Sequence, residues 1–154
     1  MRVPTESTMK QRLAAAIAVF LANDSELLRS EVSERAMTHK FAEALQTVFP
    51  SWHVDCEYNR YGKVPKTIDL PERAGKNVFP DIIIHRRGRP DNLLVVEAKT
   101  SNASQEDIDY DRRKLDAYIS GKLGYRYALF LTFTVGAAPD VSFEWHILTR
   151  EKVN

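Results

Sequence analysis

The stretch from Val78 to Lys99 reads VFPDIIIHRRGRPDNLLVVEAK. Its two ends, Val78–His85 and Leu93–Lys99, are rich in β-branched and aliphatic residues, which is typical of buried strands. The polar run Arg86–Asn92 between them contains glycine and proline, which favour a turn. The stretch is therefore predicted to form a hairpin, and this hairpin places the chemistry-bearing residues of the chain.

The charged residues of this hairpin are predicted to meet. If the hairpin is symmetric about Arg89, Asp81 lies directly opposite Glu97 on the neighbouring strand. Side chains two residues apart on a strand share a face, so Glu97 and Lys99 point the same way. Two acids side by side on an aliphatic hairpin repel each other and lose hydration, and a divalent cation would compensate. All-oxygen ligands suit Mg²⁺ or Mn²⁺, and the backbone carbonyl of Ala98 is a third available oxygen.

Lys99 stands within reach of this pair of acids. Its ammonium could orient or activate a water, or stabilise charge that develops on a phosphate. A structural alternative is that Glu97 and Lys99 form a salt bridge across a solvated sheet face, with Asp81 marking the start of a strand. The aliphatic run before Glu97 favours the functional interpretation, because charged groups are rarely placed in a buried strand without a partner.

The other segments predict the frame around the hairpin. Helices are expected at about 8–22, 31–49 and 106–120, and further strands at 54–59, 125–134 and 141–148. Residues 23–30 are expected to form a turn with a short helical piece, and residues 61–77 a long loop. This order predicts an α/β or α+β fold in which a mixed β-sheet is flanked by helices. At 154 residues, the chain is expected to form a single domain over 1–154.

Helical geometry selects Glu34 as a further acid of interest. At about 100° per residue, Met37, Phe41 and Leu45 all fall within about 60° of Glu34, so this carboxylate continues the apolar stripe of its helix. A carboxylate in that place either serves an internal site or, together with Ser33, caps the start of the helix.

Composition limits the possible partners. The chain has 22 Lys and Arg against 21 Asp and Glu, a net charge of +1, so nucleic-acid binding would need local basic patches. The single cysteine, Cys56, excludes an internal disulfide and a cysteine-rich zinc site, and it suits a reducing, cytoplasmic compartment. Alternation along strand 54–59 predicts that Cys56 faces the core. The apolar run Leu13–Ala22 is too short to span a bilayer, so no membrane partner is expected.

A local basic patch is predicted in and beside the long loop. Its candidate nucleic-acid contacts are the basic residues Arg60, Lys63, Lys66 and Lys76, with Tyr58 available to stack on bases or sugars. Lys114 could contact phosphate, or it could pair with Asp111 on a solvated helix face. His85 shares the predicted strand face of Asp81 and either lines a cleft or packs structurally. The chain carries no helix-turn-helix, zinc-finger or RNA-recognition signature, so sequence-specific readout is not expected.

Pro80-Asp81, Glu97-Ala98-Lys99 and Glu34 together resemble the motif of the PD-(D/E)xK nuclease superfamily, which includes many restriction endonucleases and Holliday-junction resolvases. The element order over about 31–134 is similar to the αβββαβ core of that superfamily, with an extra N-terminal helix and a C-terminal strand. The resemblance implies that Asp81, Glu97 and the Ala98 carbonyl hold Mg²⁺ or Mn²⁺ and that Lys99 positions the attacking water. For Glu34 it implies contact with a second metal or with a metal-bound water.

The resemblance implies a metal-dependent phosphodiesterase, and we expect it to be a DNA endonuclease. Some related families carry a Gln and a Tyr four residues apart in the helix after the motif, where this chain has Lys114 and Tyr118. To cut both strands together, so small a chain would have to act as a homodimer, and a larger defence or repair complex is also open. One alternative is a catalytically silent nuclease-fold subunit that binds nucleic acid or assembles with a partner protein. Another is an unrelated α/β interaction domain, in which Glu97 would be exposed and indifferent to metal.

Overall fold

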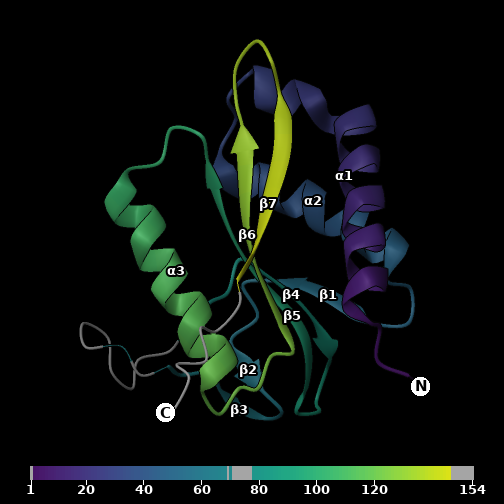
Figure 1. Cartoon of the computed structure of the whole chain (residues 1–154), viewed down its shortest axis with the longest axis vertical. Coiled ribbons are helices and arrows are strands. Elements are labelled where there is room, and N and C mark those ends of the chain that lie inside the picture. Colours follow the sequence, from purple (N-terminus) through teal and green to yellow (C-terminus); the bar gives the residue numbers. More distant parts are fainter. Residues whose placement is uncertain (1, 69, 71–77, 147–154) are drawn as a thin grey trace, which may run out of the picture.

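In the described part of the chain, two helices are followed by five strands, a third helix and two further strands (Figure 1). The computed structural model describes residues 2–68, 70 and 78–146. The helices are α1 (Glu6–Arg29), α2 (Glu34–Val48) and α3 (Gln105–Ser120). The strands are β1 (His53–Cys56), β2 (Arg60–Tyr61), β3 (Val64–Pro65), β4 (Ile82–Arg86), β5 (Asp91–Thr100), β6 (Tyr127–Thr134) and β7 (Asp140–His146). Apart from the short β2–β3 hairpin, the order from α2 to β6 is the expected αβββαβ.

Five strands form one mixed sheet in the order β1-β4-β5-β6-β7. β5 and β6 run parallel, whereas the other neighbouring strands are antiparallel. Parallel neighbours need a long crossover connection, and α3 supplies it between β5 and β6. α1 and α2 lie on one side of the sheet and α3 lies on the other (Figure 1). The predicted class, a mixed sheet flanked by helices, is confirmed.

The β4–β5 hairpin has the predicted register. Ile82 pairs with Val96, and Ile83 pairs with Val95, so the two strands are symmetric about Arg89 over this stretch. Continued by one residue, the same register brings Asp81 beside Glu97. The register shifts between Ile84 and His85, where a bulge interrupts the ladder near the turn.

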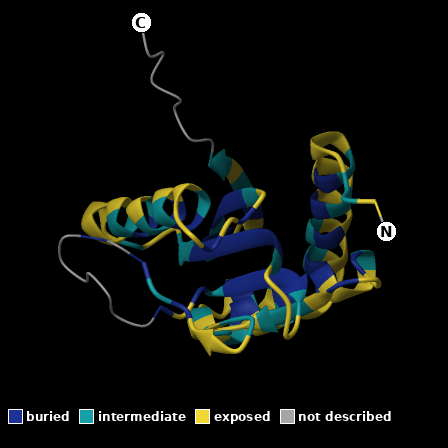
Figure 2. Ribbon diagram, turned by 90° about the horizontal axis from the view of Figure 1, so that it is seen from below, coloured by how far each residue is buried: buried dark blue, intermediate teal, exposed yellow. Residues whose placement is uncertain are grey.

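Each face of the sheet buries its own apolar cluster, and the central strands β4, β5 and β6 are strongly buried (Figure 2). The larger cluster joins the sheet to α1 and α2, and it includes Phe20, Phe41, Val96, Ala98 and Phe133. The smaller cluster joins the sheet to α3, and it includes Ile83, Val95, Leu115, Tyr118 and Phe130. Residues of β5 thus alternate between the two clusters, which places Glu97 and Lys99 on the α3 side.

The first helix is longer than predicted. α1 continues without interruption through residues 23–30 as far as Arg29 because Leu28 extends its buried side and is fully inaccessible to solvent. Its end is sharp, since Glu31 adopts a left-handed backbone conformation with φ of 49°. The second helix therefore begins at Glu34 rather than Glu31.

The first strand is shorter than predicted. β1 ends at Cys56 because Glu57 has a positive φ of 50°. The prediction that Cys56 faces the core is wrong, since its side chain is exposed at this end of the strand. The expected loop over 61–77 contains most of the β2–β3 hairpin, and residues 69 and 71–77 of it lie outside the described residues.

The other boundaries also differ from the predicted ones. β4 begins at Ile82, four residues after the predicted Val78, so Asp81 precedes the strand, and β5 extends over Asp91–Thr100 where Leu93–Lys99 was predicted. α3 begins one residue earlier than expected, and β6 begins two residues later. The predicted strand 141–148 corresponds to β7, and its last two residues lie outside the described part of the chain. No helix in the described part of the chain combines the length and apolar character needed to cross a bilayer.

Candidate metal centre

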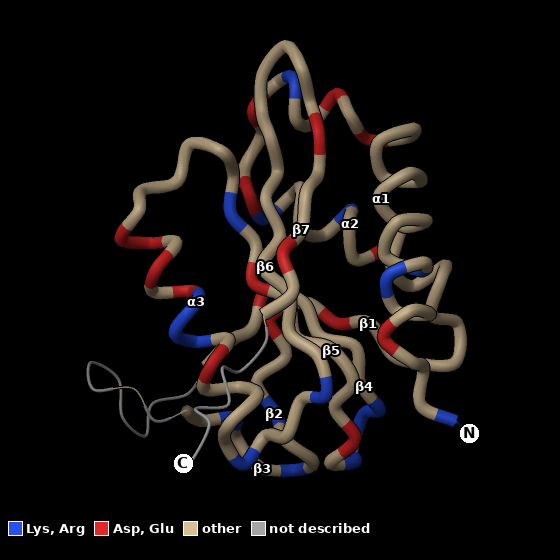
Figure 3. The backbone as a smooth tube through the Cα atoms, viewed as in Figure 1, with Lys and Arg blue, Asp and Glu red and all other residues tan. Residues whose placement is uncertain are grey.

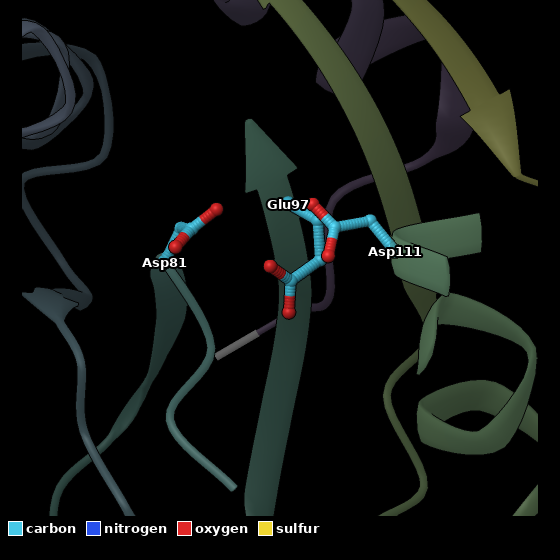
Figure 4. Close-up of side chains that lie close together, drawn as sticks. All are labelled: Asp81, Glu97 and Asp111. Carbon is cyan, nitrogen blue, oxygen red and sulfur yellow. The ribbon is translucent and has the colours of Figure 1, made fainter. Parts of the chain in front are cut away.

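Three carboxylates from different elements meet on the α3 side of the sheet. Asp81 stands just before β4, Glu97 lies within β5, and Asp111 belongs to α3. One carboxylate oxygen of each lies within 4.8 Å of the other two. Figure 4 shows the Glu97 side chain between those of Asp81 and Asp111. The predicted pair of acids is thus brought together, with a third acid that the sequence analysis did not assign to the site.

The backbone of β5 holds Asp81 in place. The Ala98 N–H donates a hydrogen bond of 2.8 Å to Oδ2 of Asp81, which ties this carboxylate to the strand that carries Glu97. On the other side, the N–H of Glu57 donates to the Pro80 carbonyl over 3.0 Å. These contacts position Asp81 through its backbone and one oxygen.

Glu97 is the least compensated acid of the cluster. Its side chain is inaccessible to solvent, and no donor among the described residues makes a well-aligned hydrogen bond to either of its oxygens. Burial raises the pKa of Glu97 well above its ordinary value, and the nearby charge of Asp81 raises it further. The Lys114 ammonium lies 3.2 Å from one of the Glu97 oxygens, and this buried carboxylate beside Asp81 also fits the oxygen-ligand chemistry of Mg²⁺ or Mn²⁺.

The Lys99 side chain lies among carboxylates, which favour its positively charged form. Its ammonium lies 3.0 Å from Oδ2 of Asp111 and 3.7 Å from Oε1 of Glu34. Burial is the largest influence and disfavours its charge, but the surrounding carboxylates, Asp111 first, outweigh burial and raise the pKa. A lysine with a raised pKa is suited to stabilising negative charge or orienting a water, and it is unsuited to accepting a proton.

Glu34 joins the site from the other side of the sheet. It is the first residue of α2, directly after the N-cap Ser33, whose side chain accepts a hydrogen bond from the N–H of Ala36. Burial raises the pKa of Glu34, although Lys99 opposes this effect. The two interpretations of this helix start are therefore compatible, because Ser33 caps the helix while Glu34 reaches Lys99.

The structure also brings Lys114 to the cluster. Its ammonium lies 3.2 Å from both Oε2 of Glu97 and Oδ1 of Asp111. The expected Asp111–Lys114 pair is present, but the expected solvated helix face is wrong, since Asp111 is 2% exposed. In the tube view the beginning of α3 is acidic and its middle basic (Figure 3).

Asp111 was detectable by the same geometry that selected Glu34. With Ile108 as the origin at 100° per residue, Asp111, Leu115 and Tyr118 fall within about 80° of it, on the side that packs against the sheet. Asp111 therefore interrupts an apolar stripe. This helical position can be read from the sequence, but the many charged residues around Asp111 make the apolar stripe hard to recognise.

A cavity opens beside the acids on the side of α2 and β1. Its volume is about 600 Å³, and Glu34 and Asp81 contribute to its wall. Arg35 and Glu57 line it as well, and they form an exposed ion pair of 3.1 Å. Glu34 and Asp81 are the acids of the site that line this cavity, whereas Glu97 is inaccessible to solvent.

The predicted basic patch is only partly available to a ligand. Arg60 and Lys63 are exposed, but the prediction for Lys66 is wrong because this side chain is completely buried. The Lys66 ammonium donates to the Tyr58 carbonyl over 3.1 Å and to the Tyr125 hydroxyl over 2.8 Å. Lys76 lies outside the described residues.

Tyr58 and His85 form a separate polar group near the turn of the hairpin. The Tyr58 ring packs against the His85 ring at 4.4 Å between centroids, so it is not free on both sides for stacking. His85 is 2% exposed, and its Nε2 lies 2.8 Å from Oδ2 of Asp55. The structural interpretation of His85 is therefore confirmed.

Two structural alternatives are contradicted by the burial of Glu97. A salt bridge between Glu97 and Lys99 on a solvated face does not form, because Glu97 faces Lys114 and Lys99 faces Asp111. An exposed, surface Glu97, expected for an unrelated interaction domain, is equally inconsistent with its complete burial.

The fold and the cluster define a class, an α+β protein with a partly buried site of carboxylates and lysines. Comparison with protein-family models, with curated proteins and with solved structures gave no match. The chemistry of the site is therefore inferred from its own residues.

Proposed function

We propose that the protein is a metal-dependent phosphodiesterase, a DNA endonuclease of the PD-(D/E)xK type. The observation that carries this proposal is the fully buried Glu97, whose oxygens lack aligned donors and lie within reach of Asp81 and Asp111. Four carboxylates, with Glu34 included, face two ammonium groups. A divalent cation would balance the remaining negative charge if all four acids are ionised.

The residues divide the proposed chemistry among them. Asp81, Glu97 and the carbonyl of Ala98 would hold Mg²⁺ or Mn²⁺, and Glu34 would hold a second ion or a bound water. When bound, the ion supplies a Lewis acid for a phosphate oxygen and lowers the pKa of a water. Lys99 remains protonated and stabilises the negative charge that develops at the scissile phosphate. Arg60 and Lys63 are exposed and can follow a nucleic-acid backbone by charge.

A second function is favoured by the ion pairs themselves. Lys99 and Lys114 already pair with Glu34, Asp111 and Glu97, so the cluster can exist as a structural network. In that case the protein is a catalytically silent subunit that binds nucleic acid or a partner protein. A silent subunit would keep its stability in a metal chelator and would show no cleavage under any condition.

A cleavage assay separates the two functions. The substrates are linear duplex, circular, single-stranded and branched DNA, with an RNA of the same sequence, each in Mg²⁺, Mn²⁺ or EDTA. Glu97→Gln and Lys99→Met are the test variants, because both keep the approximate volume of the side chain and remove its charge. We expect metal-dependent cleavage by the wild type and its loss in both variants.

The matched control is Glu43→Gln, which removes a carboxylate from the exposed side of α2. This variant should cleave like the wild type. Cleavage that survives Glu97→Gln would refute the proposed site. Absence of cleavage on every substrate, together with no Mn²⁺ binding by calorimetry, would favour the silent subunit.

A further inference from the structure

Four charged groups alternate in sign across the metal centre. The Lys99 ammonium lies 3.0 Å from Asp111, the Lys114 ammonium lies 3.2 Å from the other oxygen of Asp111, and the same ammonium lies 3.2 Å from Glu97. Two of these groups come from β5 and two from one turn of α3. The helix thus contributes a pair, Asp111 and Lys114, that links the proposed catalytic lysine to the buried glutamate.

The two acids of this row differ in their partners. Each oxygen of Asp111 has an ammonium within 3.2 Å. Glu97 has one such neighbour, at Oε2. Among the described residues, no aligned hydrogen bond reaches either oxygen of Glu97, and none reaches Oδ2 of Asp111. Glu97 is therefore the acid that remains available to a cation, whereas Asp111 serves to hold the two lysines.

Lys114 and a divalent cation would need the same carboxylate. An ion bound to Glu97 would stand a few ångströms from the Lys114 ammonium, and two positive charges at that separation in a partly buried site repel strongly. This inference rests on the proposed function: we propose that Lys114 occupies the Glu97 carboxylate as its internal partner in the metal-free protein and competes with Mg²⁺ or Mn²⁺ for it. Lys114 is in this sense a positioning residue that sets the metal affinity.

Two neighbours of Lys114 can hold its ammonium away from Glu97. Asp111 lies three residues earlier on the same helix and keeps its ion pair without any movement of the backbone. The ring of Tyr110 lies 5.4 Å from the ammonium and supplies a second, weaker attraction. The lysine can therefore leave Glu97 while its charge stays within the site.

Calorimetric titration with Mn²⁺ tests this competition without reference to cleavage. The proteins are the full chain as wild type, Lys114→Met, Lys114→Gln and Lys114→Arg. Both uncharged variants should bind Mn²⁺ at least about tenfold more tightly than the wild type, because the competing charge is gone. Lys114→Gln keeps an amide donor for Glu97 and serves if the methionine variant does not fold. Lys114→Arg retains the charge and should stay within about threefold of the wild type.

The matched control is Lys122→Met, which removes an exposed lysine just after α3. It should bind Mn²⁺ like the wild type. Wild-type binding with unchanged or weaker affinity in both uncharged variants would overturn the role of Lys114 and leave the proposed function standing. Absence of Mn²⁺ binding in the wild type and in both uncharged variants would overturn the proposed function as well.

Discussion

The two faces of the sheet differ in what β5 contributes to them. On the side of α1 and α2, β5 contributes Val96 and Ala98 to a continuous apolar cluster. On the side of α3, the same strand contributes Val95 and then Glu97, where the apolar cluster gives way to carboxylates and ammonium groups. The comparison indicates that one face supplies the stability of the fold, while the other gives up part of its apolar packing for a charged site.

The difference arises from the pleat of a single strand. Neighbouring side chains of β5 point to opposite faces, so charge can be added to one face without disturbing the other. The cost is confined to the α3 side, where Glu97 is buried without aligned donors. Five substitutions test whether the two faces contribute separately to stability and to cleavage.

The largest effect is expected from Glu97→Gln. Loss of this carboxylate as a metal ligand should reduce the cleavage rate by about 1,000-fold or more. Because the pKa of Glu97 is raised above 4.5, the folded state keeps a proton that the unfolded state has released, and the free energy of unfolding falls as the pH rises from about that value. Glutamine does not titrate, so this fall in the free energy of unfolding is absent from the variant. The variant should therefore be at least as stable as the wild type at neutral pH. Cleavage assays and thermal denaturation measure the two effects.

The corresponding substitution on the other face is Phe133→Ala. Phe133 packs against Phe20 at 5.7 Å and Phe41 at 6.1 Å between ring centroids, so its removal leaves a cavity in the larger cluster. The free energy of unfolding should fall by about 3–5 kcal/mol, measured by urea denaturation. At temperatures where the variant stays folded, cleavage per molecule should remain within a few-fold of the wild type. A folded variant that has lost cleavage would show that the two faces are not independent.

The pH dependence of stability reports on Lys66, which is buried on the α3 side. Burial lowers its pKa from 10.5 to about 8, so the unfolded state binds more protons between these values. The free energy of unfolding attributable to Lys66 should therefore rise with pH over that window, by at most about 3 kcal/mol. Urea denaturation of wild type and Lys66→Met at pH 7, 8, 9 and 10 isolates this contribution. An equal slope in the two proteins would contradict the burial of the ammonium.

The smallest effects are expected at two helix caps on opposite faces. Ser33 caps α2, and Ser104 caps α3 by accepting from the N–H of Asp107 over 3.2 Å. Ser33→Ala and Ser104→Ala should each lower the free energy of unfolding by about 1 kcal/mol. Only Ser33→Ala should also slow cleavage several-fold, because Glu34 directly follows this cap. Equal cleavage by the two variants would argue against a role for Glu34.

The site was predictable where its residues share one local element. The hairpin register that places Asp81 beside Glu97 follows from its symmetry about Arg89, and the structure has that register over Ile82 and Ile83. The common face of Glu97 and Lys99 follows from the pleat of one strand. The helical stripe through Glu34 is equally local, and Met37, Phe41 and Leu45 are all buried as it required.

The failed predictions for Lys66 and Cys56 have different causes. Lys66 was expected to contact nucleic acid, but it lies against the hydroxyl of Tyr125, which is far away along the chain. Cys56 was expected to alternate into the core, but the backbone turn at Glu57 ends the strand. A distant packing partner therefore decided the position of Lys66, whereas a local backbone turn decided that of Cys56.

Residue patterns were enough to predict the hairpin, the mixed sheet flanked by helices, and the two acids and the lysine of the hairpin. These features depend on the periodicity of strand and helix, which acts over a few residues. The positions of Asp111 and Lys114 of α3 beside Glu97, and the burial of Lys66, follow from the packing of the folded chain. Those contacts depend on how a helix packs on a sheet, since the distance between elements is set by the apolar side chains that fill the space between them.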